Sequence, residues 1–361
     1  MQVEIDRAAR RAGRHVGVAV GVATGGTTQV AGYGTTGRSG DTPDASTSFQ
    51  IGSVTKVVTA LLLADAVTRG EVALEQPLSC AFPAAASHPS GRPIRLVDLA
   101  THTSGLPRLP PGVVRQARQQ RDDPYASFTL EQLEQALTQP PKRPPGGTPR
   151  YSNYGAGVLG EALARLTGDP YAQLVHDRIV VPLGLRDTTI EVDTREGNVA
   201  VGHTRRGRVT PDWHLPALAG AGALRASIRD LLVLLRAHLD PPSTPLEPAT
   251  RLVMVPRAQI SRPLFVGLGW HILDRKGGAR WWWHNGGTGG FRSFVGLDPA
   301  ARRAVAVLAN DPRSVDRIGH LLLSTAPAAL VTGVTVGAGL GLIIGAITRA
   351  QVSGDGTEAH P

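Results

Sequence analysis

The stretch Ser53-Val54-Thr55-Lys56 opens a long apolar segment that runs to Arg69 and stops at Gly70. Apolar residues cover most of the surface that a helix over this segment would have, so we expect a buried helix. Ser53 and Lys56 then share one face of its first turn. Free amides at the start of a helix stabilise an anion, and a buried lysine with a lowered pKa can accept a serine proton. The stretch predicts a nucleophilic serine with a lysine base; a capping serine beside a surface lysine explains the pair equally well.

A second segment places a tyrosine and an asparagine just before a helix. It reads Pro145-Gly146-Gly147-Thr148-Pro149-Arg150-Tyr151-Ser152-Asn153-Tyr154-Gly155. Residues two apart in an extended segment point the same way, so Tyr151 and Asn153 would face one site. There the tyrosine could relay a proton and the asparagine could hold a substrate amide. Taken alone, the segment is better explained by a helix cap at Ser152 or Asn153 with a packing Tyr151.

A third segment, Trp281-Trp282-Trp283-His284-Asn285-Gly286-Gly287-Thr288-Gly289-Gly290-Phe291, is a strand pattern that ends in a glycine-dense turn. Glycines such as Gly286 and Gly287 let a ligand approach the backbone closely. A backbone N–H group at such a strand edge could polarise a carbonyl. The alternative is a hairpin turn with His284 facing solvent.

In this order, the three segments resemble the serine β-lactamase/penicillin-binding-protein superfamily, and above all its class C-like branch. Ser53-Val54-Thr55-Lys56 matches the S-x-x-K motif, Tyr151-Ser152-Asn153 matches Y-x-N, and His284-Asn285-Gly286 matches the third motif, usually K-T-G but often H-x-G in this branch. Leu99-Ala100-Thr101-His102-Thr103-Ser104-Gly105-Leu106 resembles a structural loop of the family. The resemblance covers about residues 10–326 and implies a β-lactamase-related serine hydrolase, similar to D-alanyl-D-alanine carboxypeptidases and esterases.

The resemblance implies a role for each matching residue. Ser53 would be the acylated nucleophile of an ester or amide hydrolase, and Lys56 and Tyr151 would share the work of the general base. Asn153 would orient the substrate amide. The amides of Ser53 and Gly287 would form the oxyanion hole, and His284 would lie near the anionic end of the substrate. Gly286 belongs with them to the substrate-binding and oxyanion set. No metal and no cofactor is expected.

The third motif departs from K-T-G, and this leaves the substrate open. A histidine such as His284 is often neutral near pH 7, which weakens carboxylate recognition and favours an esterase or amidase over a true β-lactamase. The alternative function is a membrane sensor that recognises penicillin or cell-wall fragments without turnover. A purely structural domain would require all four segments to be coincidental.

Strand patterns at both ends of the chain predict the fold. The first pair, at 15–22 and 28–33, reads as a hairpin, and four later runs lie at 267–273, 278–284, 292–297 and 303–308. Helical patterns alternate with Pro/Gly loops between them. We expect an α/β fold of the α+β type, like the β-lactamase/DD-peptidase fold, in which both chain ends form one antiparallel sheet flanked by helices. The hydrolase domain would cover 1–326, with sheet from about 10–50 and 264–326 and a helical subdomain at about 57–260.

Composition excludes several classes of protein. The net charge is +9, but the arginines are scattered and the 4% of aromatic residues do not alternate with them, so we expect no nucleic-acid partner. Cys80 is the only cysteine, which excludes an intramolecular disulfide and a cysteine-rich zinc module.

The C-terminal tail predicts a membrane anchor. Residues 328–347 carry no charge over 20 residues, enough for a helix to span a bilayer. We therefore expect a single-pass transmembrane helix at 328–348, self-association through Gly333, Gly337, Gly341 and Gly345, and a disordered end at 349–361. A buried core helix or a flexible glycine-rich tail is the alternative. No apolar run typical of a secretory signal follows the N-terminal basic cluster, so the side of the membrane stays open.

Overall fold

The computed structural model describes residue 5 and residues 15–37, 40–190 and 197–324. The chain divides into a unit of residues 1–325 and a second unit of residues 326–361, and every described residue lies in the first. The strands are β1 (Gly17–Thr24), β2 (Thr27–Gly34), β3 (Ser48–Gln50), β4 (Arg225–Ser227), β5 (Ala258–Ser261), β6 (Leu264–Val266), β7 (His271–Asp274), β8 (Arg280–Gly287), β9 (Arg292–Asp298) and β10 (Arg303–Ala309).

The helices alternate with loops through the middle of the chain. They are α2 (Thr55–Thr68), α3 (Leu96–Ala100), α4 (Val113–Gln119), α5 (Leu130–Leu137), α6 (Asn153–Thr167), α7 (Tyr171–Val175), α8 (Val181–Leu183), α9 (Ala219–Gly222), α10 (Ile228–Leu239), α11 (Glu247–Val253) and α12 (Asp316–Ser324). Short 3₁₀ turns are η1 (Gly52–Val54), η2 (Leu78–Cys80), η4 (Pro216–Leu218) and η5 (Pro241–Ser243), whereas η3 (His176–Val180) is a wider π-helical turn.

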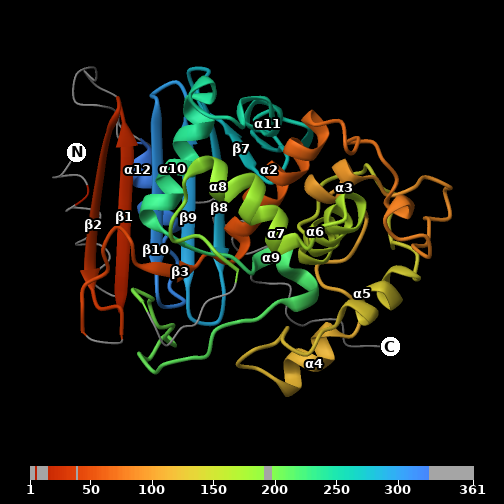
Figure 1. Ribbon diagram of the computed structural model, residues 1–361, viewed down its shortest axis with the longest axis horizontal. Helices are drawn as coiled ribbons and strands as arrows, with labels where there is room; N and C mark the ends of the chain where they lie inside the picture. Colours follow the sequence, from red (N-terminus) through yellow and green to blue (C-terminus); the bar gives the residue numbers. More distant parts are fainter. Residues whose placement is uncertain (1–4, 6–14, 38–39, 191–196, 325–361) are drawn as a thin grey trace. The chain divides into compact units, whose positions relative to one another are not determined.

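One antiparallel sheet joins the two ends of the described chain. Its strand order is β2-β1-β10-β9-β8-β7-β6-β5, so the N-terminal hairpin pairs with the last strand. Figure 1 shows β1 and β2, in red, beside the blue strands of the C-terminal part. Strands β3 and β4 form a separate two-stranded sheet, and β3 ends just before Ser53. The expected sheet from both chain ends is therefore confirmed.

Helices cover both faces of the sheet. A side chain at Gly21 of β1 would meet Ile228 and Leu232 of α10, whereas Phe294 of β9 packs against Gly319 of α12. Neighbouring residues along a strand point to opposite faces. The register aligns Gly21 with Ala306, Val295 and His284 across the sheet, so these positions share the face that α10 covers. The third motif thus faces the helical side that carries α2.

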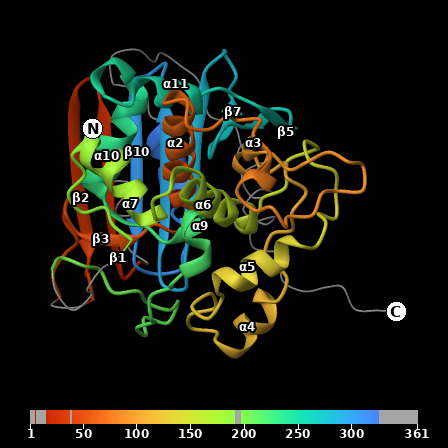
Figure 2. The same cartoon turned by 45° about the vertical axis from the view of Figure 1, so that its right-hand side comes forward.

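Helix α2 lies at the centre of the helical side. It contacts α6, α9 and α11, and its residues from Thr55 to Ala66 are buried. Figures 1 and 2 both show α2 between the sheet and α6. This all-round burial follows from its composition, because a helix with apolar residues on every side is stable only inside the core. The expected buried helix is confirmed, and Gly70 follows its end with a φ of +74°.

The sequence patterns located most later strands to within a few residues and missed others. The run expected at 278–284 is β8 at Arg280–Gly287, and the run expected at 267–273 shrinks to β7 at His271–Asp274. Strands β3, β4, β5 and β6 are three or four residues long, too short for an alternating pattern. The boundaries of the helical subdomain stay a prediction.

The expected membrane anchor requires a correction. Residues 325–361, which include the expected helix at 328–348, the four self-association glycines and the tail at 349–361, lie outside the described residues. No helix within the described ranges is long and apolar enough to cross a membrane. The prediction of a transmembrane helix and of single-pass localisation is therefore not supported. Its physical weakness lies in the glycines of 328–347, because each costs a helix about 1 kcal/mol relative to alanine in water.

Candidate active site

Ser53 lies on a tight turn that packs against the end of β8. The turn requires glycine at position 52, where φ is +49° and a Cβ atom would lie 2.7 Å from the nitrogen of Gly287. At Gly286 a Cβ atom would lie 2.1 Å from the carbonyl oxygen of Ile51 and 3.0 Å from the nitrogen of Ser53. The missing side chains therefore let the backbone of Ser53 and the backbone of the third motif meet.

The amine of Lys56 lies beside the Ser53 hydroxyl. Its Nζ is 3.1 Å from Ser53 Oγ, 2.9 Å from Asn153 Oδ1 and 2.7 Å from the carbonyl oxygen of Ala221. Lys56 is 3% exposed. Burial, and then repulsion from the Arg108 guanidinium, hold the pKa of Lys56 well below its usual value of 10.5. All three contacts are with neutral oxygens, so none of these hydrogen bonds brings a negative charge to the amine.

The three contacts suit an uncharged amine. A neutral amine has two N–H donors and one lone pair. Asn153 Oδ1 and the Ala221 carbonyl oxygen can only accept, so they take the two donors. The lone pair is then left for the Ser53 hydroxyl, which can donate its proton to the amine. The geometry therefore prepares transfer of a proton from Ser53 to Lys56.

The loop before α6 brings Tyr151 and Asn153 to the same place. Ser152 caps the helix by accepting a hydrogen bond from the nitrogen of Gly155 at 2.8 Å. The loop is tied to the segment 99–106, since the nitrogen of Arg150 donates to the carbonyl oxygen of His102 at 2.7 Å. The nitrogen of Ser152 also donates to His102 Nδ1 at 3.3 Å. Both the capping role and the site-facing role expected for this segment are therefore present.

Tyr151 is a phenol that keeps its proton at neutral pH. Burial raises the pKa of Tyr151 to about 12, and its hydrogen bond with Ser53 only partly offsets this. The ring lies 4.9 Å from the Lys56 Nζ and 5.3 Å from the Arg108 Cζ, measured to its centroid. A group with this pKa donates a proton more readily than it accepts one.

Three histidines surround Tyr151, and all are held neutral. Their rings lie 4.7 Å (His102), 6.3 Å (His271) and 6.3 Å (His284) from the Tyr151 ring, between centroids. Burial is the main cause that lowers the pKa of each, to about 4 for His271. His284 is 1% exposed, so it does not face solvent, and its Nδ1 donates to the Asn285 carbonyl oxygen at 2.6 Å. Its Nε2 has no hydrogen-bond partner in the described part of the chain.

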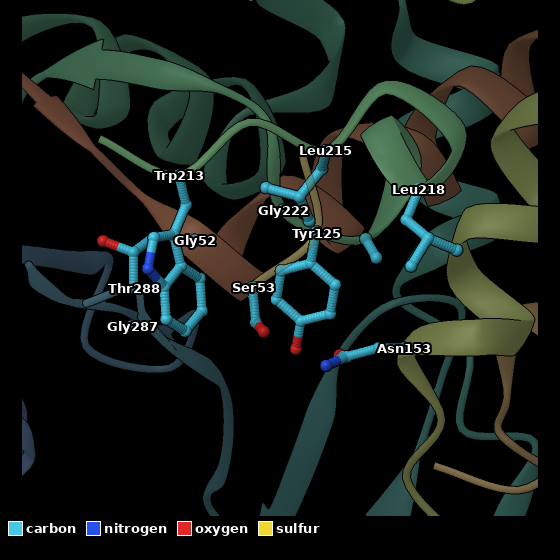
Figure 3. Close-up of a pocket in the computed structure, with 11 residues that line it drawn as sticks. Gly52, Ser53, Tyr125, Asn153, Trp213, Leu215, Leu218, Gly222, Gly287 and Thr288 are labelled. Carbon is cyan, nitrogen blue, oxygen red and sulfur yellow. The ribbon is translucent and has the colours of Figure 1, made fainter. Parts of the chain in front are cut away.

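A pocket opens beside Ser53, with about 320 Å³ of empty space that is partly open to solvent. Figure 3 shows the hydroxyl groups of Ser53 and Tyr125 and the amide of Asn153 pointing into the same space. Trp213 contacts Tyr125 edge to face, with ring centroids 5.4 Å apart. The complete lining is Gly52, Ser53, Tyr125, Asn153, Trp213, Leu215, Leu218, Ala221, Gly222, Gly287 and Thr288. Around the nucleophile the walls therefore combine apolar and aromatic side chains with polar groups in similar measure.

The structure brings together all seven residues expected from the sequence motifs: Ser53, Lys56, Tyr151, Asn153, His284, Gly286 and Gly287. Trp283 does not line the pocket but packs against Phe294 and His320. Sequence reasoning missed Arg108, Tyr125, Trp213, Ala221 and His271 as members of the site. The only sequence signal for any of them is the place of Arg108, two residues after the segment 99–106. In the described ranges, no cluster of His, Cys, Asp and Glu side chains could hold a metal ion.

Comparison with known proteins decides the family. The family model described as "Beta-lactamase" matches residues 5–324. The chain belongs to the Beta-lactamase family. Among its relatives, the D-alanyl-D-alanine-carboxypeptidase/endopeptidase AmpH of Escherichia coli K12 is 30% identical over 279 residues, which cover 71% of this chain and 69% of the relative. A beta-lactamase of the same organism is 26% identical over 314 residues, 76% of this chain and 80% of that protein.

Solved structures support the fold of this Beta-lactamase family member. A class C beta lactamase from Rhodobacter sphaeroides superimposes with a TM-score of 0.77 at 24% identity, covering 90% of this chain and 98% of that one. A beta-lactamase/D-alanine carboxypeptidase from Pseudomonas syringae gives 0.78 at 21% identity, covering 90% and 99%. The expected family and its fold are confirmed, and the chain is a serine hydrolase of the beta-lactamase family.

Proposed function

We propose that this chain hydrolyses esters or amides through an acyl-enzyme on Ser53, with the neutral amine of Lys56 as the base. The observation that carries this proposal is the 3.1 Å contact between Lys56 Nζ and Ser53 Oγ. The two N–H groups of the neutral amine are accepted by Asn153 Oδ1 and the Ala221 carbonyl oxygen. A base must lie within hydrogen-bond reach of the proton that it removes, and this one does.

Acylation begins when Ser53 Oγ attacks the substrate carbonyl and its proton passes to Lys56. The backbone N–H groups of Ser53 and Gly287 stabilise the negative charge that develops on the carbonyl oxygen. Tyr151 then donates its phenol proton to the leaving atom as the carbonyl–leaving group bond breaks. The Lys56 ammonium returns a proton to Tyr151, which restores both groups. This division of work assigns the base to Lys56 alone, because a phenol with a pKa of about 12 is a poor base at neutral pH.

Deacylation follows the same route with water in place of the leaving group. Water attacks the acyl carbonyl and one of its protons passes to Lys56, which then returns a proton to the Ser53 oxygen as the bond between Ser53 and the acyl group breaks. Asn153 orients the substrate through its amide nitrogen, since its Oδ1 is engaged with Lys56. No step needs a metal ion or an organic cofactor.

The pocket supports an acyl group of apolar or aromatic character. Tyr125, Trp213 and Leu215 line it, and such walls bind apolar surface through the hydrophobic effect. The neutral imidazole of His284 supplies no charge for a substrate anion at the third motif. Two substrate classes therefore remain candidates: simple esters, and D-alanyl-D-alanine peptides of the kind named for the Escherichia coli relative.

The test is covalent labelling of the full chain. The protein is incubated with a 4-nitrophenyl ester of an arylacetic acid, and intact mass is followed during release of nitrophenol. We expect one transient acyl adduct on Ser53, and neither adduct nor turnover in a Ser53→Ala variant. Turnover by Ser53→Ala at the parent rate would overturn the proposal. An adduct that forms but never hydrolyses would favour a non-turnover sensor instead.

A further inference from the structure

The two aromatic walls of the pocket come from separate loops. Tyr125 lies in the turn between α4 and α5, whereas Trp213 lies in the loop before η4. Their rings meet edge to face with centroids 5.4 Å apart, and each ring lines the pocket beside Ser53. Figure 3 shows the two rings next to the Ser53 side chain. The width of this pocket therefore depends on how the two loops are held.

The loop that carries Trp213 is anchored to β3. Gln50 donates through Nε2 to the Trp213 carbonyl oxygen at 2.9 Å, and its Oε1 accepts from the Trp213 nitrogen at 3.3 Å. In the same loop, Asp212 binds the buried guanidinium of Arg225 at 2.8 Å. Gln50 is the last residue of β3 and precedes Ser53 by three positions. These contacts therefore fix Trp213 relative to the nucleophile.

The carboxylate of Asp123 ties the turn that carries Tyr125 to this loop. Asp123 Oδ1 accepts a hydrogen bond from the backbone nitrogen of His214 at 2.9 Å, and Oδ2 accepts from His214 Nδ1 at 2.6 Å. A carboxylate only accepts, so Nδ1 carries a hydrogen in this contact. Within the turn, the nitrogen of Phe128 donates to the Tyr125 carbonyl oxygen at 3.0 Å. That local bond shapes the turn, and the paired contact with His214 connects it to the loop of Trp213.

The contact between Asp123 and His214 lies at the surface. The His214 side chain is exposed and Asp123 is half-buried. A charged pair in such a position contributes little to the stability of the whole fold, because water screens it. Its loss should therefore release the turn locally and leave the core intact.

The position of the leaving group assigns the acyl group to this pocket. In the proposed mechanism, Tyr151 donates a proton to the leaving atom. The lining includes Ser53 and Gly287, whose amides would hold the carbonyl oxygen, but it does not include Tyr151. The acyl group is then the part of the substrate that the two aromatic rings contact.

We propose that Asp123 and His214 are positioning residues for specificity: their contact holds Tyr125 against Trp213 and so makes the pocket selective for bulky acyl groups. This inference rests on the proposed function, because it needs an acyl group on Ser53. A bulky acyl group between two closely held rings buries more apolar surface than a small one. When the turn is released, that advantage is lost.

The test compares 4-nitrophenyl phenylacetate with 4-nitrophenyl acetate, which share a leaving group and differ in the size of the acyl group. Rates are measured for the full-length protein, and those of Ser53→Ala are subtracted. In Asp123→Ala, the phenylacetate-to-acetate ratio of kcat/KM should fall by about 2- to 10-fold, as for loss of one net hydrogen bond. The melting temperature should stay near that of the parent. His214→Ala keeps the backbone donor and should lower the ratio less; an unchanged ratio in both variants would overturn the inference.

Two further variants separate positioning from a general effect. Tyr125→Ala should lower the ratio by itself, and adding Asp123→Ala should lower it no further, because Asp123 acts through Tyr125. Asp177→Ala is the matched control: it removes another exposed contact, between His176 Nδ1 and Asp177 Oδ1 at 2.7 Å, and should leave the ratio unchanged. Additive falls in the double variant, or an equal fall in Asp177→Ala, would also overturn the inference. If the wild-type protein hydrolyses neither ester and Ser53 is never acylated, the proposed function itself fails.

Discussion

The side-chain oxygen of Asn153 accepts a hydrogen bond from the Lys56 amine at 2.9 Å, which joins the first turn of α6 to the first turn of α2. An asparagine at this position contributes a neutral acceptor. An aspartate of the same shape would place a negative charge there and favour the ammonium form of Lys56.

Asn153→Asp should therefore shift the acid limb of the pH–activity profile. A carboxylate within hydrogen-bond distance raises the pKa of a lysine by about 1–3 units. Since Lys56 must be neutral to accept the Ser53 proton, kcat/KM at neutral pH should fall, and activity should recover as the pH rises. Asn153→Ala is the control, because it removes the contact without adding charge and should lower kcat/KM with little shift of the limb. Identical profiles in the two variants would contradict a neutral Lys56.

Removing the amine itself should have a larger effect. Lys56→Met should lower kcat/KM for a neutral ester by about 10²–10⁴-fold, the usual contribution of a general base. Lys56→Arg separates charge from basicity, since a guanidinium stays protonated and cannot accept the Ser53 proton. Steady-state rates and the rate of Ser53 acylation should fall together in both variants. Near-normal acylation in Lys56→Arg would assign the base to another group.

The loss of activity in Tyr151→Phe should depend on the leaving group of the substrate. A phenol with a pKa of about 12 acts as a proton donor, and a nitrophenolate leaving group needs no proton to depart. We expect about a 10²-fold loss on alkyl esters and a much smaller loss on 4-nitrophenyl esters, as for removal of a general acid. The measurement is kcat/KM across a series of phenyl and alkyl esters of one acid. Equal losses along the series would instead give Tyr151 a role in activating Ser53.

Strand β8 lies so close to the turn of Ser53 that adding one methyl group at Gly286 should lower both stability and activity. In Gly286→Ala the new Cβ would lie 2.1 Å from the Ile51 carbonyl oxygen, so the turn that carries Ser53 must move. We expect a loss of stability of about 1–3 kcal/mol, as for overpacking of a core, and a marked loss of kcat. Thermal unfolding and ester hydrolysis measure the two effects. Gly147→Ala is the control, since its Cβ would meet only the Pro144 carbonyl oxygen, at 3.5 Å.

The sequence predicted those parts of the site that depend on local spacing. Ser53 and Lys56 share a helical face because they are three residues apart, and Tyr151 and Asn153 share a direction because they are two apart. The order of the motifs then identified the family and with it the fold. Each of these signals lies within one short segment of chain.

The missed parts depend on contacts between distant segments. The carbonyl oxygen of Ala221 accepts from Lys56 across 165 residues of chain, and a backbone oxygen has no sequence signature. Arg108, Tyr125 and His271 reach the site because loops and strands from distant parts of the sequence converge there. A local sequence pattern cannot predict such contacts. The short strands β5 and β6 gain their stability from neighbours in the sheet rather than from their own pattern.

The most direct test of the central claim is a titration of Lys56 by NMR. The chain has three lysines, so protein labelled with [ε-¹³C]lysine gives few signals. The Lys56→Met variant assigns the signal of Lys56. A Lys56 signal that titrates well below 10.5 is the predicted result, and one that titrates at or above 10.5 would contradict activation of Ser53 by a neutral amine.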